Sequence, residues 1–417
     1  MRFLALLCSV SAYDLVGFTA SGLEYGMGPN GPLFAEAIPG RLENYDVNKA
    51  LPVAGTGQRF FKPATTSLQT LISKGANTIR IPFAWERLVP NMPVALNGGA
   101  VTLNTTYAAY IDQTVLTVTN AGAFAILDLH NYARYNFRGV SAGLASSVLG
   151  GGVLKAEHLA ATWKAIAARY RANPKVIYSI MHEPYDMPDG GTTYMNGAID
   201  AIAAIRTLST QMVLVSGVDW ATGWGFSWNS AQVIQPLVAR NFSNVVIDMH
   251  HYFDFKVGPG PHTACGATDF ASQFDATTAW LAANNQKAFI GEIGVTSACT
   301  PVMKNLLTYL STKPQWIGLA YFSAGPGWDK VYPDLYVEKA GGFIGGVQLE
   351  TVVAFSPKVG SVTPAPAHAP VPAPSPTPAP SPSPIPAPAP PAPAPPAPAP
   401  VTSNFQLTGV NVNGSIN

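Results

Sequence analysis

Short apolar runs alternate along the chain with longer segments whose apolar residues recur at helical spacing. The runs that predict strands occupy residues 77–83, 124–130, 176–184, 213–220, 244–252, 288–295 and 317–325. Helical periodicity marks residues 65–75, 106–122, 159–174 and 195–209. Strands that alternate with helices in this way predict parallel βα units. About seven or eight such units in one domain favour an α/β fold of the (β/α)8 TIM-barrel type over an open sheet.

Polar side chains that can do chemistry gather near the ends of these predicted strands. They are Arg80, His130, Glu183, His250, Tyr252 and Glu292. In a barrel of parallel strands, the carboxyl ends of all strands meet on one face, where functional sites are built. Any one of these residues alone is as readily explained by an ion pair or a structural hydrogen bond. Because all of them fall at the same end of successive strands, we predict that they surround one cleft.

The N-terminal segment "MRFLALLCSVSA" has an arginine, then a short apolar run, then small residues. This order is typical of a secretory signal peptide and is too short to cross a bilayer. We predict that residues 1–20 are the leader, with cleavage after Ala12 or Ala20. Cys8 would instead suit a lipoprotein signal, although "LALLC" fits that pattern poorly. No later stretch has the length and hydropathy of a transmembrane helix, so we expect a secreted, extracellular protein without a membrane partner.

Composition divides the remainder of the chain. We predict a folded domain at residues 21–355, a linker at residues 356–400 and a short unfolded tail at residues 401–417. Residues 364–400 contain 19 of the 38 prolines and no Asp, Glu, Lys or Arg, which is typical of an extended, disordered Pro-rich spacer. Such a segment tethers the remnant of a lost domain, acts only as a spacer, or presents a ligand to a proline-binding domain.

Charge and cysteine content narrow the partners and the compartment. The 24 Lys and Arg against 23 Asp and Glu give a net charge of +1, so nothing favours nucleic acid as a partner. Two cysteines, Cys265 and Cys299, remain after the leader. In an exported protein they are expected to pair, and two free buried thiols are the alternative.

Five segments together resemble a known family. They are "RIPFAWERLVP", "DLHNYARY", "HEPYDMP", "DMHHYFD" and "GEIG". Their order and spacing resemble glycoside hydrolase family 5, and in particular its secreted endo-β-1,4-glucanases, the cellulases of fungi and some bacteria. The resemblance covers most of residues 23–330. It implies a TIM barrel that hydrolyses a polysaccharide, β-1,4-glucan. We expect a monomer that needs no cofactor and no metal ion. "HTAC" and "TSAC" also resemble disulfide positions of the family, which supports pairing Cys265 with Cys299.

The resemblance assigns roles to the polar residues at the strand ends. Retaining glycosidases place two carboxylates about 5–5.5 Å apart, one on each side of the bond that breaks. By resemblance, Glu183 is the acid/base and Glu292 is the nucleophile. We expect the Arg80 cation to help keep Glu292 ionised, and the Tyr252 hydroxyl to hydrogen-bond it.

Other residues are expected to contact the sugar. His130 and His250 would bind sugar hydroxyls or tune the carboxylates. Trp228, with Trp220 as a second candidate, would stack on pyranose rings, and core packing is the alternative for both tryptophans. Phe322 replaces the tryptophan that the family usually carries on its last strand, with Tyr321 as the neighbouring alternative.

One residue departs from the family inside the catalytic motif. The position before the acid/base is normally asparagine, whose amide contacts the sugar, and here it is His182. A charged His182 would lower the pKa of the neighbouring acid, which is the wrong direction for a proton donor. The departure leaves two alternatives to an active endo-glucanase: the same fold acting on another β-glucan or a β-mannan, and a carbohydrate-binding protein with impaired turnover. A metal enzyme ranks below these, because this hydrolysis needs no metal.

Overall fold

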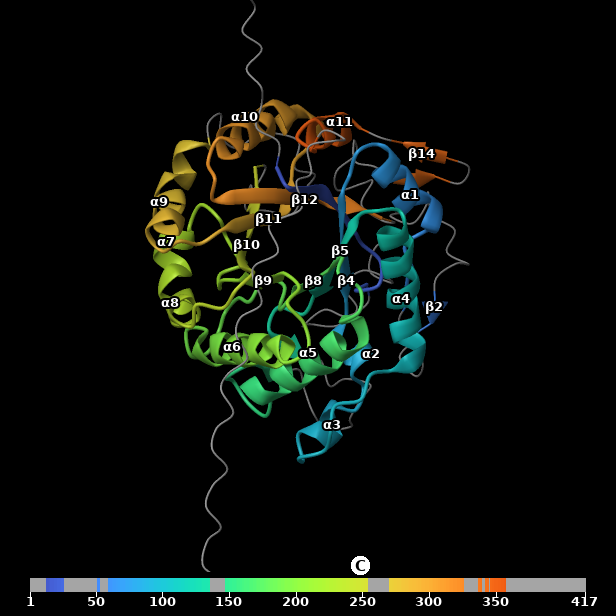
Figure 1. Ribbon diagram of the computed structural model, residues 1–417, viewed down its shortest axis with the longest axis vertical. Coiled ribbons are helices and arrows are strands. Elements are labelled where there is room, and N and C mark those ends of the chain that lie inside the picture. Colours follow the sequence, from blue (N-terminus) through green and yellow to red (C-terminus); the bar gives the residue numbers. More distant parts are fainter. Residues whose placement is uncertain are drawn as a thin grey trace, which may run out of the picture. The chain divides into compact units, whose positions relative to one another are not determined.

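The computed structural model describes residues 13–25, 51–52, 59–135, 147–253, 270–325, 337–339, 342–344 and 346–357. All of them belong to one unit, residues 1–363, whereas residues 364–417 form a second unit that lies outside the described part. The described residues form a closed barrel of parallel strands in the order β1-β12-β11-β10-β9-β8-β5-β4 (Figure 1). The predicted TIM barrel is therefore confirmed.

The barrel strands and the helices around them follow the predicted alternation. The strands are β1 (Leu15–Ala20), β4 (Thr78–Phe83), β5 (Phe124–Leu129), β8 (Val176–Ser179), β9 (Val213–Ser216), β10 (Val245–Tyr252), β11 (Ala288–Gly294) and β12 (Trp316–Ala324). The longer helices are α1 (Thr65–Ser73), α4 (Thr105–Asn120), α5 (Ala156–Tyr170), α6 (Thr192–Arg206), α8 (Ala231–Ala239), α9 (Asp275–Ala283), α10 (Thr300–Ser311) and α11 (Val347–Val353).

Several short helices and two-stranded sheets accompany the barrel in the described residues. They are the helices α2 (Trp85–Leu88), α3 (Met92–Ala95) and α7 (Phe226–Asn229), and the two-stranded sheets β2 (Leu51–Pro52) with β3 (Arg59–Phe60), β6 (Arg134–Tyr135) with β7 (Ser147–Val148), and β13 (Val337–Lys339) with β14 (Gly342–Ile344). None of the helices in the described part is long and apolar enough to cross a membrane.

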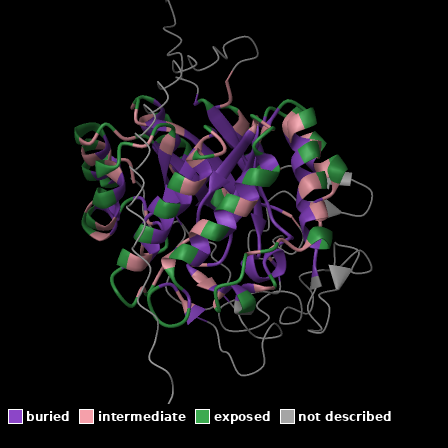
Figure 2. Ribbon diagram, turned by 60° about the horizontal axis from the view of Figure 1, so that its bottom comes forward, coloured by how far each residue is buried: buried purple, intermediate pink, exposed green. Residues whose placement is uncertain are grey.

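Helix α4 illustrates how the outer layer forms. The side chain of Asn104 caps its first turn by accepting a hydrogen bond from the backbone N–H of Tyr107 at 3.0 Å. Ile111, Val115 and Val118 recur at helical spacing and are buried, so one face packs on the barrel. Figure 2 shows the same division throughout, with buried strands inside helices whose outward faces are exposed.

Strand β1 corrects one predicted boundary. Leu15–Ala20 is wholly buried and pairs with β12 on one side and β4 on the other. A Cβ atom on Gly17 would lie 1.7 Å from the Thr78 carbonyl oxygen, so the two strands approach closely only because residue 17 is glycine. A domain beginning at residue 21, as predicted, would therefore lack a barrel strand, whereas one beginning at Tyr13 contains it. Residues 1–12 lie outside the described residues.

Candidate active site

The barrel interior consists of an apolar layer followed by a polar one. A cluster separate from the main core takes one residue from each of seven strands: Leu15, Ile126, Ile177, Leu214, Val246, Phe289 and Ala320. Side chains two residues apart on a strand point the same way. The next layer of inward-facing side chains, nearer the carboxyl ends of the strands, is polar. It consists of Arg80, Asp128, Ser179, Ser216 and Asp248, all 0% exposed. A polar layer this deep must satisfy its charges internally.

Arg80 balances the charges of this layer. Its Nη2 atom lies 3.0 Å from Asp128 Oδ1 and 3.3 Å from Asp248 Oδ2. A Cβ atom on Gly291 would lie 2.4 Å from Arg80 Nη1 and 1.8 Å from Asp248 Oδ1, so glycine leaves room for the pair. Burial opposes the charge of Arg80, but the two aspartates outweigh burial and raise its pKa. The guanidinium is thus a fixed cation buried inside the barrel.

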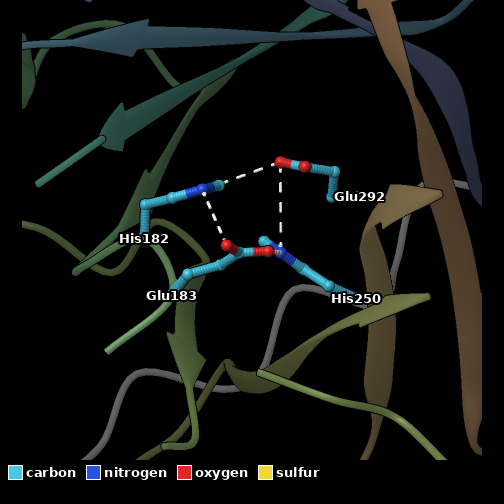
Figure 3. Close-up of side chains that lie close together, drawn as sticks. All are labelled: His182, Glu183, His250 and Glu292. Atoms are coloured by element: carbon cyan, nitrogen blue, oxygen red, sulfur yellow. Dashed lines mark hydrogen bonds and ion pairs between the residues drawn. The ribbon is translucent and has the colours of Figure 1, made fainter. Parts of the chain in front are cut away.

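Four residues meet just beyond this layer, and we refer to His182, Glu183, His250 and Glu292 as the four-residue cluster (Figure 3). One side-chain nitrogen or oxygen atom from each lies within 4.8 Å of the corresponding atom of every other. His250 Nδ1 is 2.7 Å from Glu183 Oε1 and 4.0 Å from Glu292 Oε2. His182 Nδ1 is 3.8 Å from Glu292 Oε2. The two glutamates predicted from the strand ends therefore face each other across a few ångströms.

A β-bulge turns Glu292 into the barrel. Phe289 belongs to the interior cluster and Ile290 to the outer core, so strict alternation would send Glu292 outward with Ile290. The pairing of β10 with β11 slips by one residue, which leaves Gly291 unmatched and sets His250 opposite Glu292. Bulges commonly re-aim a side chain beside a functional site, as this one does.

The two oxygen atoms of Glu292 have different surroundings. The Tyr252 hydroxyl donates a short hydrogen bond to Oε1, in line with the role expected for Tyr252. Oε2 is buried and has no hydrogen-bond partner among the described residues. Glu292 as a whole is only 4% exposed. One oxygen is thus fixed by a hydrogen bond, and the other lies buried near the rings of His182 and His250.

Backbone conformation also sets the site apart. Glu183 has φ of +41°, and Tyr132, Ala133 and Trp220 have φ between +54° and +58°. Few residues other than glycine occupy this left-handed region, and those that do are concentrated at functional sites. These four residues lie in the loops that follow β5, β8 and β9. All four lie at the carboxyl end of the barrel, whereas Asn241, Asn244 and Asn285, which also have positive φ, precede β10 and β11.

Protonation in the cluster is set by burial and by close pairs. Burial alone would lower the pKa of His250, but its contacts with Asp248 and Glu183 outweigh burial and raise the pKa to about 10. Burial raises the pKa of Glu292 to about 7; the His250 cation and Arg80 act against this rise, and the charge of Glu183 adds to it. Arg80 therefore acts in the expected direction on Glu292, but burial outweighs it.

His182 is held as a neutral ring. Burial, and then the nearby cations of His130, His250 and Arg80, lower its pKa well below the usual value. Its ring stacks on that of His130, with centroids 3.5 Å apart. His130 is in turn anchored by Asp128, whose Oδ2 lies 2.9 Å from His130 Nδ1. The charged His182 considered from the sequence is not the state that these surroundings favour.

Exposed aromatic rings lie in the segments that follow β8 and β9. Trp228 is 58% exposed and meets Trp224 edge-on at 5.3 Å, so core packing does not account for it. Among the contacts of the described residues, none joins Trp228 to the four-residue cluster. Trp220 is 48% exposed and stacks on Tyr185, with ring centroids 4.7 Å apart. The Arg134 guanidinium lies over the ring of Tyr185, 4.0 Å from its centroid. The Tyr185–Trp220 pair links the loop after Glu183 to the loop after β9.

Strand β12 separates the two remaining aromatic candidates. The Tyr321 hydroxyl donates to the Val295 carbonyl oxygen at 2.8 Å, and its ring lies 6.2 Å from that of Phe18. Tyr321 is thus committed to the core. Phe322 is 6% exposed and remains the candidate on this strand for contact with a sugar.

Two functional residues were missed from the sequence. Asp128 and Asp248 each precede a predicted site histidine by two residues, in "DLH" and "DMH". Residues two apart on a strand share a face, so each aspartate lies beneath its histidine. The repeated D-x-H spacing on two strands was the available signal.

Comparisons with known proteins agree with this geometry. Residues 44–326 match the family model described as cellulase, glycosyl hydrolase family 5. Endoglucanase gh5-1 of Neurospora crassa is 33% identical over 278 residues, 65% of this chain and 65% of that protein, slightly under two thirds of its length. Endo-beta-1,4-glucanase B of Emericella nidulans is 31% identical over 324 residues, 76% of this chain and 85% of that protein. Manganese dependent endoglucanase Eg5A of Phanerodontia chrysosporium is 32% identical over 67% of this chain and 70% of that protein.

Solved structures share the fold. Cel5A (EG2) from Hypocrea jecorina (Trichoderma reesei) superposes with a TM-score of 0.64 at 23% identity, over 82% of this chain and 98% of that one. XacCel5A in complex with cellopentaose gives a TM-score of 0.64 at 24% identity, over 82% of this chain and 99% of that one. Because the family model covers more than half of the sequence, this chain belongs to glycosyl hydrolase family 5, the cellulases.

Proposed function

We propose that this protein is a retaining endo-β-1,4-glucanase that hydrolyses internal bonds of cellulose or related soluble β-glucans. The observation that carries the proposal is the pair of facing carboxylates, with one oxygen atom of Glu183 and one of Glu292 within 4.8 Å. That separation suits double displacement, because the attacking carboxylate leaves no room for a water molecule on its side. The relatives named as endoglucanases support the substrate class.

The reaction divides into two steps. Glu292 attacks the anomeric carbon while Glu183 gives its proton to the departing glycosidic oxygen. Glu183 then removes a proton from water, which attacks the same carbon and releases Glu292. In this scheme the proton lies on Glu183 and the negative charge on Glu292 when the glucan is attacked. Arg80, His250 and the Tyr252 hydroxyl all stabilise the negative charge on Glu292.

The remaining site residues would position the sugar. His182, neutral and stacked on His130, presents a hydrogen-bonding ring where the family has an amide. Trp220 and Trp228 offer exposed faces on which pyranose rings can stack, whereas Phe322 on β12 is 6% exposed and offers only a small part of its ring. The glucan would therefore cross the carboxyl end of the barrel over these loops.

Two substrates separate the roles of the glutamates. Glu292→Gln should abolish release of reducing sugar from carboxymethyl cellulose between pH 4 and pH 8. Glu183→Gln should do the same, yet it should retain much more activity on an aryl β-cellobioside, whose phenolate leaves without a proton. Unfolding in urea checks that both variants are folded. Near-normal activity of either variant on carboxymethyl cellulose would contradict the assignment of the two glutamates as catalytic residues. If Glu183→Gln lost as much activity on the aryl β-cellobioside as on the polymer, Glu183 would not be the acid.

Export and cross-linking complete the proposal. We propose an extracellular protein whose leader ends at Ala12, because β1 begins only three residues later at Leu15. Cys299 is buried at the start of α10, whereas Cys265 lies outside the described residues, so their disulfide remains a prediction. Mass spectrometry of the secreted protein, before and after reduction, tests the cleavage site and the disulfide together.

A further inference from the structure

Arg134 joins two of the segments that carry the active site. It lies in β6, after β5, and its Nη1 atom donates hydrogen bonds to the carbonyl oxygen of Tyr132 at 2.7 Å and to that of Tyr185 at 3.0 Å. Tyr132 follows His130 by two residues, and Tyr185 follows Glu183 by two residues. Hydrogen bonds from a charged donor are stronger than neutral ones. One half-buried guanidinium therefore holds the backbone of both segments.

The ring of Tyr185 lies between two flat groups. The guanidinium carbon of Arg134 is 4.0 Å from the ring centroid, and the Trp220 ring is stacked at 4.7 Å with 9° between the two planes. One face of a phenol ring has no room for both groups at these distances, so they cover opposite faces. We call this three-layer arrangement the Arg134–Tyr185–Trp220 stack. Its outermost member, Trp220, is exposed.

The backbone beside the stack is also fixed. The N–H of Trp220 donates to the carbonyl oxygen of Pro184, the residue directly after Glu183, at 3.3 Å. The next residue, Ala221, accepts a hydrogen bond from the backbone N–H of His250 at 2.8 Å. Glu183 and Trp220 both have positive φ, a conformation that persists only where surrounding contacts impose it. The stack and these hydrogen bonds are such contacts.

The reaction places the stack on the side of the leaving group. Glu183 gives its proton to the departing glycosidic oxygen, so the sugar that departs must lie next to Glu183. Tyr185 and Trp220 pack against the segment that carries Glu183. An exposed indole face is a surface on which the apolar face of a pyranose ring can stack.

We propose that the exposed face of Trp220 binds the first sugar of the leaving group, and that Arg134 is a positioning residue for the acid/base Glu183. This inference rests on the proposed function and adds to it a side of the cleft and a residue that acts through Tyr185. Without Arg134, the segment from Glu183 to Tyr185 loses two of its restraints. A displacement of about 1 Å at a reacting group can lower a rate by about 100-fold.

Two substrates with different leaving groups test the role of Arg134. Cellopentaose has a sugar as its leaving group and needs the proton of Glu183, whereas the fluoride of β-cellobiosyl fluoride leaves with little help from an acid. Arg134→Met should lower kcat/KM for cellopentaose by about 10–100-fold. It should change kcat/KM for β-cellobiosyl fluoride by less than about threefold. Arg134→Lys, which keeps the charge, should recover part of the loss.

The matched control is Arg171→Met, which removes an exposed arginine at the end of α5 and should leave both substrates unaffected. Urea unfolding checks that each variant is folded.

Trp220→Ala gives a second test that does not depend on the folding of the Arg134 variants. It should raise KM for cellopentaose by about tenfold and leave KM for β-cellobiosyl fluoride unchanged, because fluoride makes no contact with the indole. Isothermal titration measures the same effect without turnover. In a Glu292→Gln background, adding Trp220→Ala should weaken cellopentaose binding by about tenfold.

The contrary outcomes are distinct. Equal losses on both substrates in folded Arg134→Met would show that Arg134 supports the barrel and not the acid, and full activity on cellopentaose would show that it supports neither. Unchanged cellopentaose binding after Trp220→Ala would place the leaving sugar elsewhere. If the wild type hydrolysed neither substrate, the proposed function would fail, whereas cellopentaose binding that depends on Trp220 would still keep the sugar site.

Discussion

Glu292 lies where its charge is unfavourable. Its carboxyl group is buried, lies within a few ångströms of Glu183, and has one oxygen atom without a hydrogen-bond partner among the described residues. Burial raises its pKa from 4.5 to about 7. A group whose pKa is raised by folding contributes most stability below its unfolded pKa, and that contribution is lost as pH rises through the folded value. The folded protein should therefore lose stability at this residue between pH 4.5 and pH 7.

Removing that charge should stabilise the protein. We expect Glu292→Gln, although inactive, to increase the free energy of unfolding by about 1–3 kcal/mol at pH 8. The gain should shrink toward zero near pH 5, where Glu292 is protonated in the wild type. Urea unfolding of both proteins at the two pH values measures it. A gain of equal size at both values would show that the charge of Glu292 is not its cause.

Strands β1 and β11 show where sequence patterns mislead. The residues of β1 directly follow the apolar stretch at the N-terminus, so the two stretches look like one in the sequence, and only strand pairing separates them. On β11, alternation directs Glu292 outward, and only the bulge at Gly291 reverses it. In both strands the outcome depends on pairing with residues far away in the sequence, and a local pattern of apolar and polar residues carries no information about that pairing.

The β1 correction gives a direct test with two truncated chains. A chain beginning at Tyr13 should fold and unfold cooperatively, because β1 is present to pair with β12 and β4. A chain beginning at Ser21 should lack cooperative thermal unfolding, because the barrel cannot close. Circular dichroism of the two chains decides between them. A cooperative transition of the same midpoint in the shorter chain would show that β1 is dispensable.

The molecule as a whole combines a barrel with a segment of different composition. Residues 364–417 have neither the charge nor the apolar periodicity of a packed domain. We expect a chain that ends at Thr363 to keep the thermal midpoint of the full protein and its kcat/KM on carboxymethyl cellulose. Side-by-side assays of the two chains measure this. A drop in either quantity would show that the Pro-rich segment supports the barrel or the cleft.

Much of the architecture could be predicted because the strands of a parallel barrel are buried on both faces and so occur in the sequence as apolar runs. Seven of the eight barrel strands were recognised in this way, and strand ends led to Glu183, His250 and Glu292. The buried aspartates were missed because the D-x-H spacing shows that each shares a face with its histidine, but not that Arg80 lies between the two strands and pairs with both carboxylates. Protonation was also out of reach, since it depends on burial and on neighbours distant in the sequence.

The adjacent histidines of β10 have opposite surroundings. His250 contacts Glu183 in the active site, and its pKa is raised to about 10. His251 packs among Phe253, Phe270 and Phe274, and burial lowers its pKa to about 3. An alignment of related sequences that slides by one position here would still match histidine to histidine. It would nevertheless exchange a cleft residue for a core residue. Gaps near β10 and β11 should therefore be placed by the bulge, so that a substitution at either histidine is assigned to the correct side of the strand.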